Sequence, residues 1–263
     1  MDLRLKNIRA LVTGSTRGLG YATARCLSFE GALVAINGRD DVRLQNVVRK
    51  LSSETGNPVY GLAGDVGDPT VPEKVIKAAY ESMGGLDILI CNAGGPPPGA
   101  FESFDETTWQ RAIDLSFMSN VRLIKAALPF LRQSQAASVL TVTSYSVKQP
   151  IPNLVLSNSI RAATIGLTKS LALELGKDGI RFNSILPAWT ETERVTELMT
   201  ARSKNNGSTL QAEIDRQASE SPLGRMSTPE EFANVATFLV SPLASYLTGV
   251  MLPVDGGMLK GTF

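Results

Sequence analysis

The chain has 263 residues, of which 43% are hydrophobic, and this is enough to build one large core. Its 26 basic and 25 acidic residues almost cancel, so no net charge attracts a nucleic acid or an anionic membrane surface. It contains no histidine, which excludes histidine-dependent catalytic triads and most zinc hydrolases. We therefore expect one domain with a small-molecule substrate and no metal ion.

Charged residues interrupt the start of the chain, at Asp2, Arg4, Lys6 and Arg9. They leave no apolar run long enough for a signal peptide. Nowhere do about 18 apolar residues follow one another, so we expect neither a transmembrane helix nor contact with a membrane. The expected location is cytoplasmic.

Short apolar runs alternate with amphipathic, helix-like stretches along the whole sequence. Unbroken apolar strands separated by helices are typical of a parallel sheet that is covered on both faces. We therefore predict an α/β fold, a doubly wound parallel sheet of about seven strands in a single Rossmann-type domain spanning 1–263. The predicted strands are 10–12, 33–36, 59–62, 88–91, 139–142, 182–186 and 250–254.

A glycine-rich turn with the sequence TGSTRGLG follows the first predicted strand, at 13–20. Glycines allow a tight turn and close approach of the backbone to a pyrophosphate, which the next helix attracts with free N–H groups and its dipole. Between a strand and a helix, this pattern predicts a dinucleotide site. The expected cofactor-binding residues here are Gly14, Ser15, Thr16, Arg17, Gly18, Leu19 and Gly20.

The end of the second predicted strand bears on the choice between NAD(H) and NADP(H). An acidic residue there binds the ribose hydroxyls of NAD(H), whereas an arginine accepts the additional phosphate of NADP(H). The residues at 37–39 are Asn-Gly-Arg, without a carboxylate. Arg39 and Arg17 offer two guanidinium groups to a phosphate dianion, so we predict NADP(H) in preference to NAD(H). In the alternative, Arg39 merely pairs with Asp40 or Asp41.

The segment from about 190 to 224 is longer than a usual connection and is polar around SKNNGST. We predict that it is a lid that crosses the ligand cleft, because such lids exclude water and set specificity. The alternative is a mobile helix pair without a catalytic purpose. After the lid, Thr228 is expected to cap a helix, with Glu231 three residues later.

Four motifs resemble those of the short-chain dehydrogenase/reductase family, particularly its members similar to 3-oxoacyl-carrier-protein reductases. They are the glycine turn, Asp65-Val66, Asn92-Ala93-Gly94 and Asp255-Gly256-Gly257, and the resemblance covers essentially the whole chain. It implies that Asp65 and Val66 contact the adenine, and that Thr192 holds the nicotinamide carboxamide. It implies that Asn92, Ala93 and Gly94 line the central cofactor cleft. It also suggests a homotetramer or homodimer.

The resemblance implies catalytic residues as well: a serine at the end of the fifth strand and a Tyr-x-x-x-Lys pair on the next helix. Ser144 matches the serine. Counting back from the family-like segment 166–172 places the tyrosine position on Ser157 and the lysine position on Arg161. An asparagine that often accompanies them falls on Ser116. The candidate catalytic residues are therefore Ser144, Ser157 and Arg161.

Ser157 and Arg161 are four residues apart on a predicted helix, so they should share one face. A serine hydroxyl is far less acidic than a phenol, and an arginine keeps its charge without releasing a proton. Arg161 can bond the nicotinamide ribose, stabilise a developing oxyanion or hold a substrate carboxylate. Tyr145 is a further possible proton donor, unless it packs under the lid.

Two hypotheses follow. In the first, the protein is an atypical NADP(H)-dependent oxidoreductase of a small carbonyl or alcohol. Ser144 then orients the carbonyl, Arg161 supplies positive charge, and the proton comes from Ser157, Tyr145 or a water molecule. In the second, the protein is catalytically silent and binds the dinucleotide as a sensor or an assembly subunit.

Overall fold

The computed structural model describes residues 1–262 and contains a sheet of seven parallel strands. Their order is β3-β2-β1-β4-β5-β6-β7, which confirms the predicted doubly wound α/β fold. The central pair β1 and β4 is the point at which the winding reverses, and ligands of such sheets bind beyond the carboxyl ends of the strands there. The strands are β1 (Arg9–Val12), β2 (Leu33–Gly38), β3 (Val59–Ala63), β4 (Ile88–Cys91), β5 (Ser138–Val142), β6 (Arg181–Pro187) and β7 (Met251–Val254).

All seven predicted strands are present, with small differences at their ends. The clearest difference is in β2, which continues past its last apolar residue, Ile36, to Gly38. Asn37 stays in the sheet because its backbone is in register with Leu62 of β3 and its side-chain Nδ2 donates to the carbonyl oxygen of Leu62. A polar side chain can therefore end a buried strand when a neighbouring strand accepts its hydrogen bond.

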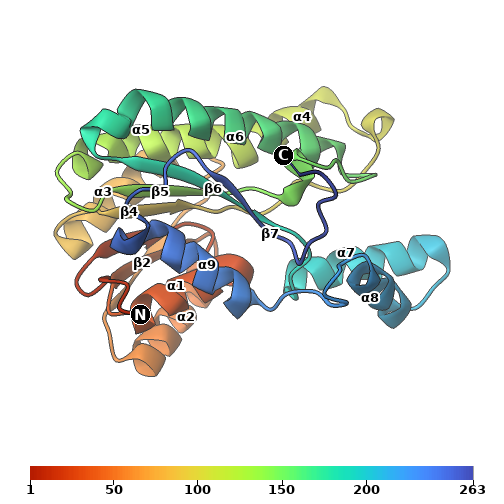
Figure 1. Cartoon of the computed structure of the whole chain (residues 1–263), viewed down its shortest axis with the longest axis horizontal. Helices are drawn as coiled ribbons and strands as arrows, with labels where there is room; N and C mark the ends of the chain where they lie inside the picture. The colour runs from red at the N-terminus through yellow and green to blue at the C-terminus, as the bar shows by residue number, and fades with distance from the viewer. Residues whose placement is uncertain (263) are drawn as a thin grey trace.

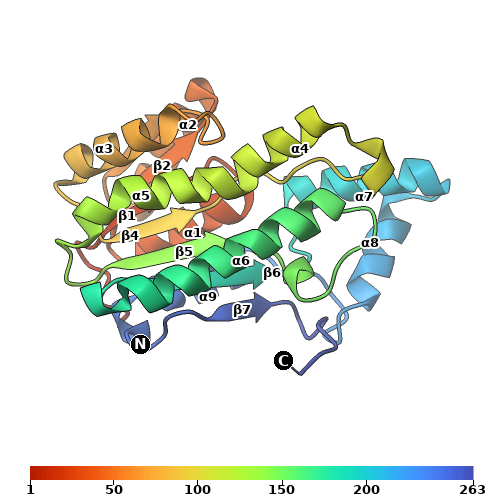
Figure 2. The same cartoon turned by 90° about the horizontal axis from the view of Figure 1, so that it is seen from above.

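Helices cover both faces of the sheet (Figures 1 and 2). Side chains alternate between the faces along each strand, so that Leu11 packs toward one face and Val12 toward the other. Both faces are buried, which explains why the strands are continuous apolar runs. One face carries α1 (Gly18–Phe29), α2 (Asp41–Thr55) and α9 (Pro229–Val240), and the other α3 (Val71–Met83), α5 (Ser119–Leu131) and α6 (Val155–Leu175).

Several shorter elements complete the chain. The α4 helix (Glu106–Ile113) leads through a π-helical segment, η2 (Asp114–Met118), directly into α5. The capping box predicted for α9 is present, with Thr228 and Glu231 as its partners. None of the helices within residues 1–262 combines the length and apolar character needed to cross a bilayer. The 3-10 helices are η1 (Phe101–Ser103), η3 (Tyr145–Val147), η4 (Gly176–Asp178) and η5 (Pro242–Ala244).

The predicted lid segment folds into two helices, α7 (Glu193–Asn206) and α8 (Leu210–Ser219), which project beyond the carboxyl ends of the strands (Figure 1). Both have threonine N-caps, Thr192 and Thr209, and Gly207 ends α7 with a left-handed φ of 61°. The polar stretch around SKNNGST thus forms the junction of two capped helices. That the pair acts as a lid over bound ligand stays a prediction.

Arg181 joins the start of β6 to the end of α9, far from the carboxyl ends of the strands. Its Nη1 donates to the carbonyl oxygens of Leu239 (2.8 Å) and Ala244 (3.1 Å), and its Nη2 to those of Val240 (2.8 Å) and Ser241 (3.0 Å). Burial lowers the pKa of Arg181 to about 10, so it is a cation at neutral pH. The charge satisfies carbonyl groups that a helix end leaves without partners.

We predict that Arg181→Met lowers the free energy of unfolding by about 3 kcal/mol, because five carbonyl groups, including that of Leu247, lose a charged donor. Urea denaturation measures the change. Arg132→Met is the matched control: its partner Asp178 is on the surface, and the loss there should stay below about 1 kcal/mol. Equal losses in the two variants would contradict this account of Arg181.

Candidate active site

The glycine turn has the geometry of an anion site at the start of α1. Gly14 and Gly18 have φ angles of 55° and 57°, which favour glycine. Arg17 occupies the N-cap position of α1 but its side chain makes no capping hydrogen bond, and the first turn holds no acidic residue. The first N–H groups of the helix therefore have no competing side-chain acceptor, and the turn fits a pyrophosphate.

Asn92, at the end of β4, holds this turn in place. Its Nδ2 donates to the carbonyl oxygens of Thr13 (3.2 Å) and Gly14 (2.9 Å). In return, the Thr13 hydroxyl donates to the carbonyl oxygen of Asn92 at 2.8 Å. A Cβ on Gly14 would lie only 2.7 Å from that same carbonyl oxygen, so a glycine is required there. Asn92 thus acts mainly as a brace between two strand ends.

Ser15 and Gly20 lie inside the turn, behind the wall of the cleft. The Ser15 hydroxyl is fully buried and donates to the carbonyl oxygen of Val12 at 2.6 Å. A Cβ on Gly20 would meet the carbonyl oxygen of Gly14 at 2.6 Å. Ser15 and Gly20 were both predicted to bind the cofactor. In the structure, the Ser15 side chain and the missing Cβ of Gly20 allow the turn to adopt its shape.

A cleft of about 540 Å³ opens at the carboxyl ends of the strands. It brings together residues from segments that are far apart in the sequence, including the predicted site residues Gly14, Thr16, Arg17, Gly18, Leu19, Arg39, Asp65, Val66, Asn92, Ala93, Gly94, Ser144, Ser157, Arg161 and Thr192. Its volume and its position beside the β1–β4 pair suit a dinucleotide together with a small substrate. Within residues 1–262, no cluster of three or more potential metal ligands occurs.

The two arginines predicted to select NADP(H) are both on the cleft wall but differ in their partners. Arg39 is 72% exposed and lies 3.5 Å from Asp65 through Nη1 and Oδ2. It pairs with neither Asp40 nor Asp41, since Asp40 caps α2 through the Arg43 N–H. The exposed Arg39 head group is therefore held only weakly by its neighbour.

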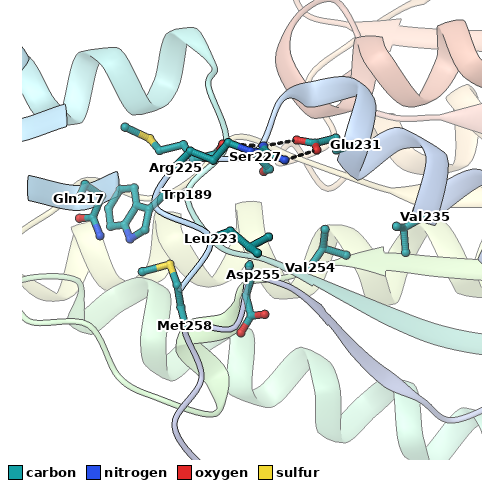
Figure 3. A pocket seen from close by; sticks show the side chains of 12 residues that line it. Trp189, Gln217, Leu223, Arg225, Ser227, Glu231, Val235, Val254, Asp255 and Met258 are labelled. Atoms are coloured by element: carbon teal, nitrogen blue, oxygen red, sulfur yellow. Dashed lines mark hydrogen bonds and ion pairs between the residues drawn. The ribbon is translucent and has the colours of Figure 1, made fainter. Parts of the chain in front are cut away.

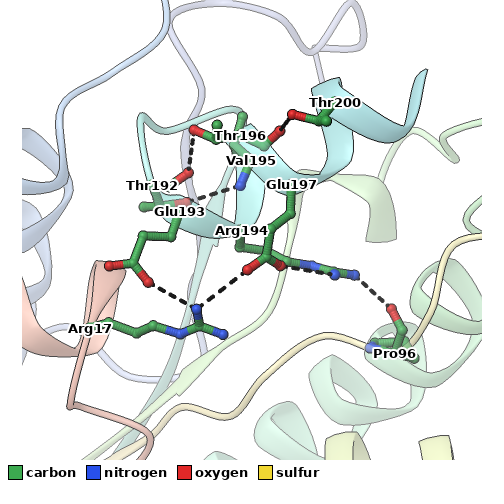
Figure 4. Close-up of polar contacts among 9 residues, drawn as sticks. All are labelled: Arg17, Pro96, Thr192, Glu193, Arg194, Val195, Thr196, Glu197 and Thr200. Carbon is green, nitrogen blue, oxygen red and sulfur yellow. Dashed lines mark hydrogen bonds and ion pairs between the residues drawn. The ribbon is translucent and has the colours of Figure 1, made fainter. Parts of the chain in front are cut away.

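Arg17 reaches across the cleft to α7, where its Nη1 lies 2.9 Å from Glu193 and 3.4 Å from Glu197 (Figure 4). On the opposite wall, Arg194 Nη2 donates to the carbonyl oxygen of Pro96 at 2.9 Å. The start of α7 is thus bonded to both walls of the cleft. Glu193, Arg194 and Glu197 were not predicted from the sequence as site residues. The only local signal for them is that three charged residues share one helix face shortly after Thr192.

Thr192 lies at this junction but its hydroxyl has a structural partner. Its Oγ1 accepts a hydrogen bond from the Val195 N–H at 3.4 Å, as the N-cap of α7. Its Cγ2 methyl group is 3.7 Å from the position of a Cβ on Gly18. Thr192 therefore brings the first turn of α7 against the glycine turn, and its contact with a nicotinamide carboxamide stays a prediction.

The three catalytic candidates lie together at the end of β5. Ser144 Oγ accepts a hydrogen bond from the Ser146 N–H at 3.1 Å. Arg161 Nε donates to Ser157 Oγ at 3.2 Å, so these two α6 residues share a face as predicted. Arg161 Nη1 donates to the carbonyl oxygens of Val142 and Thr143, each at 2.9 Å. Three acceptor oxygens thereby fix the guanidinium at the end of β5.

Burial is the main cause that lowers the pKa of Arg161 to about 10, and the positive charge of Arg194 is the second cause. From the sequence alone, this guanidinium is expected to be unable to lose its proton. The structure makes it somewhat more acidic than an ordinary arginine, but with a pKa of about 10 it remains a cation at neutral pH. Its positive charge is available to a reacting oxygen.

Tyr145 packs under the lid, which was the alternative to its acting as a proton donor. Its hydroxyl accepts a hydrogen bond from the Trp189 indole N–H at 3.1 Å, and its ring contacts the buried cluster around Met199. Burial raises the pKa of Tyr145, which makes it a poorer acid.

Trp189 and Met258 line a second cavity of about 180 Å³ between the lid and α9, in which Arg225 pairs with Glu231 (Figure 3).

Ser116 is buried in η2 and is not on the wall of the cleft. Its carbonyl oxygen accepts hydrogen bonds from Thr164 Oγ1 (3.2 Å) and Asn120 Nδ2 (2.8 Å). Within the described chain its hydroxyl has no hydrogen-bond partner. The structure therefore does not bring this side chain to the three catalytic candidates.

The chain matches known proteins over nearly its whole length. Residues 14–259 match the family model described as enoyl-(acyl carrier protein) reductase. The chain is 34% identical to dehydrogenase/reductase SDR family member 4 of Bos taurus, over 97% of this chain and 88% of that protein. It belongs to the short-chain dehydrogenase/reductase family. It is also 31% identical to the 3-oxoacyl-[acyl-carrier-protein] reductase of Aquifex aeolicus, over 98% of this chain and all of the relative.

Solved structures of this family show the same fold. L-sorbose reductase from Gluconobacter frateurii, complexed with NADPH and L-sorbose, superposes with a TM-score of 0.95 and 33% identity, covering 99% of this chain and 100% of that one. A short chain oxidoreductase from Pseudomonas aeruginosa PAO1, NADPH-bound and described as containing an atypical catalytic center, has a TM-score of 0.87 and 31% identity, covering 96% and 97%. Both of these relatives bind NADPH.

We predict that the double substitution Glu193→Gln and Glu197→Gln tightens NADPH binding by up to about fivefold, because it frees Arg17 from an exposed ion pair worth about 1 kcal/mol. Fluorescence titration of NADPH measures the dissociation constant. Arg17→Gln serves as the control and should weaken NADPH more than NADH. Weaker NADPH binding after the double substitution would show that the lid carboxylates do not compete for Arg17.

Proposed function

We propose that this short-chain dehydrogenase/reductase is an NADP(H)-dependent oxidoreductase that interconverts a small carbonyl compound and its alcohol. The observation that carries the proposal is the position of Ser144, Ser157 and Arg161 in the same cleft as the glycine turn. Arg17 and Arg39 on the cleft wall and the NADPH-bound relatives support NADP(H) over NAD(H). The bound nicotinamide would supply or accept the hydride.

The hydrogen bonds around the two serines leave their own protons free to donate. Ser144 Oγ accepts from the Ser146 N–H, and Ser157 Oγ accepts from Arg161 Nε. A hydroxyl that accepts in this way can direct its O–H elsewhere, here toward a carbonyl oxygen in the cleft. Ser144 would orient that oxygen, and Ser157 or a water molecule would deliver the proton.

Arg161 would supply the electrostatic stabilisation. Its hydrogen bonds to the end of β5 hold the guanidinium in place before the reaction begins. Negative charge that develops on the substrate oxygen then meets a fixed positive charge in a buried site, an effect worth several kcal/mol. We propose that Ser157 and Arg161 occupy the positions of the family's tyrosine and lysine, so that charge is kept while the phenolic proton donor is lost.

A catalytically silent protein is the second candidate, and one observation favours it. Among the residues of 1–262 that line the cleft there is no lysine, and the tyrosine among them, Tyr145, has its hydroxyl bound to Trp189. A cofactor site of this kind can serve a sensor or an assembly subunit. The two candidates differ in whether a carbonyl compound accelerates the oxidation of bound NADPH.

We expect Arg161→Met to lower kcat by about 100-fold or more, because it removes the fixed charge from the transition state. Arg161→Lys should restore part of the rate, since it returns a cation without the guanidinium geometry. Steady-state kinetics with the best carbonyl substrate measures both variants, and NADPH titration checks that the cofactor still binds. An unchanged kcat in the methionine variant would remove Arg161 from the mechanism.

Single-turnover oxidation of NADPH, followed by absorbance across a panel of aldehydes, ketones and β-ketoacyl thioesters, tests the proposed function directly. We expect at least one substrate to accelerate it. The double variant Ser157→Tyr and Arg161→Lys separates the two candidates. Loss of an existing activity refutes silence, whereas activity that appears only in the double variant identifies a decayed site.

A further inference from the structure

Two guanidinium groups converge on one point of the cleft, at Gly95. A Cβ on Gly95 would lie 3.9 Å from Arg161 Nη2 and 3.8 Å from both Nε and Nη2 of Arg194. The lowered pKa of Arg161 has the charge of Arg194 as one cause, in agreement with this proximity. Two like charges therefore face the same space, and such an arrangement is unfavourable unless an anion lies between them.

Within residues 1–262, Arg161 has no acidic partner, and the one acidic partner of Arg194 is Glu197. Arg161 donates hydrogen bonds to three neutral oxygens, those of Ser157, Val142 and Thr143. These bonds use its Nε and Nη1 and leave Nη2 for the cleft, which Arg161 lines. The acidic neighbour of Arg194 is Glu197, at 3.8 Å, and Glu197 is shared with Arg17. The space beside Gly95 is thus positively charged.

The backbone conformation at position 95 does not require a glycine. It is not among the residues with positive φ, so its conformation is one that other residues adopt. A Cβ there would make only ordinary contacts, at 3.8 Å and beyond. The absence of a side chain at position 95 therefore serves to leave room between Arg161 and Arg194.

The position of Gly95 and the two arginines relative to the strands argues against the cofactor's pyrophosphate as the anion between them. The pyrophosphate is expected at the start of α1, beyond β1, whereas Arg161 is bonded to the end of β5 beside Ser144. The strand β4 lies between β1 and β5 in the sheet. An anion between Arg161 and Arg194 would therefore lie on the side of the reacting carbonyl.

We propose that Arg161 and Arg194 bind the carboxylate of the substrate, and that the substrate class is a short oxo acid or the matching hydroxy acid. Planar guanidinium groups match a carboxylate in geometry and charge. The identification of the anion as part of a substrate rests on the proposed function. The carboxylate site itself does not, because it follows from the two arginines and the space at Gly95.

Isothermal titration calorimetry of the NADP⁺ complex measures this binding without turnover, since the oxidised cofactor cannot reduce a ketone. The probes are 2-oxobutanoate and its neutral methyl ester. We expect the acid to bind about tenfold more tightly than the ester, and Arg194→Gln to abolish that difference while the dissociation constant of NADP⁺ stays the same. Equal binding of acid and ester overturns the proposal. So does a parallel loss of NADP⁺ affinity in Arg194→Gln, which would identify the anion as a cofactor phosphate.

A second pair of variants tests the site without any ligand. Gly95→Asp places a carboxylate between the arginines, whereas Gly95→Asn has nearly the same shape without the charge. We expect Tm of the aspartate variant to exceed that of the asparagine variant by about 2–4 °C, and the aspartate variant to lose binding of 2-oxobutanoate. An equal or lower Tm overturns the proposal. If the acid binds and no carbonyl compound accelerates NADPH oxidation, the carboxylate site stands and the proposed function fails.

Discussion

The contact between the glycine turn and the end of β4 determines where every other part of the site can lie. Gly14 approaches the carbonyl oxygen of Asn92 so closely that no Cβ fits, and the side chains of Thr13 and Asn92 close the contact with hydrogen bonds in both directions. This places the start of α1 beside the ends of β4 and β5. A site for phosphates and a site for a carbonyl group thereby become two ends of one cleft.

Arginine supplies most of the charge in this cleft, although the chain as a whole is nearly neutral. Arg17 and Arg39 are exposed and have carboxylate partners, so a phosphate can compete for them at small cost. Arg161 is bonded only to neutral oxygens, which fix its position and leave its charge uncompensated. At the end of the cleft near Arg17 and Arg39, a ligand can replace the carboxylate partners of the arginines. At the end near Arg161, the charge is held in position before a ligand binds.

The segment that contains α7 and α8 contacts the cleft in two places, at the exposed start of α7 and at the buried side chain of Trp189. At the surface, α7 bonds to the glycine turn through Arg17 and to the opposite wall through Pro96. At the base, Trp189 takes the hydroxyl of Tyr145 into a buried apolar cluster. The phenol nearest to Ser144 in the sequence thus has its hydroxyl bound to Trp189, and the cleft near the end of β5 is lined by two serines and two arginines.

Local chemistry was enough to predict the strands and the dinucleotide turn. A strand that is buried on both faces can be recognised from a short apolar run, and a tight turn from a few closely spaced glycines, which tolerate positive φ. The family resemblance singled out Ser157 and Arg161. Helical spacing then predicted that they share one face, because a helix brings residues four apart together. The hydrogen bond from the Asn37 side chain could not be predicted in this way, since its acceptor, the carbonyl oxygen of Leu62, belongs to a neighbouring strand.

Only the tertiary structure decided which side chains meet across the cleft. Arg17 and Glu193 are 176 positions apart, and Arg194 and Pro96 are 98 apart. Their contacts depend on the order of strands in the sheet and on the direction in which α7 leaves it, and neither is encoded by a short pattern. The sequence by itself therefore determined the fold, the cofactor turn and the candidate catalytic residues. The charge at Gly95 emerged only when β4, α6 and α7 were brought together, because electrostatic interactions act through space and not along the chain.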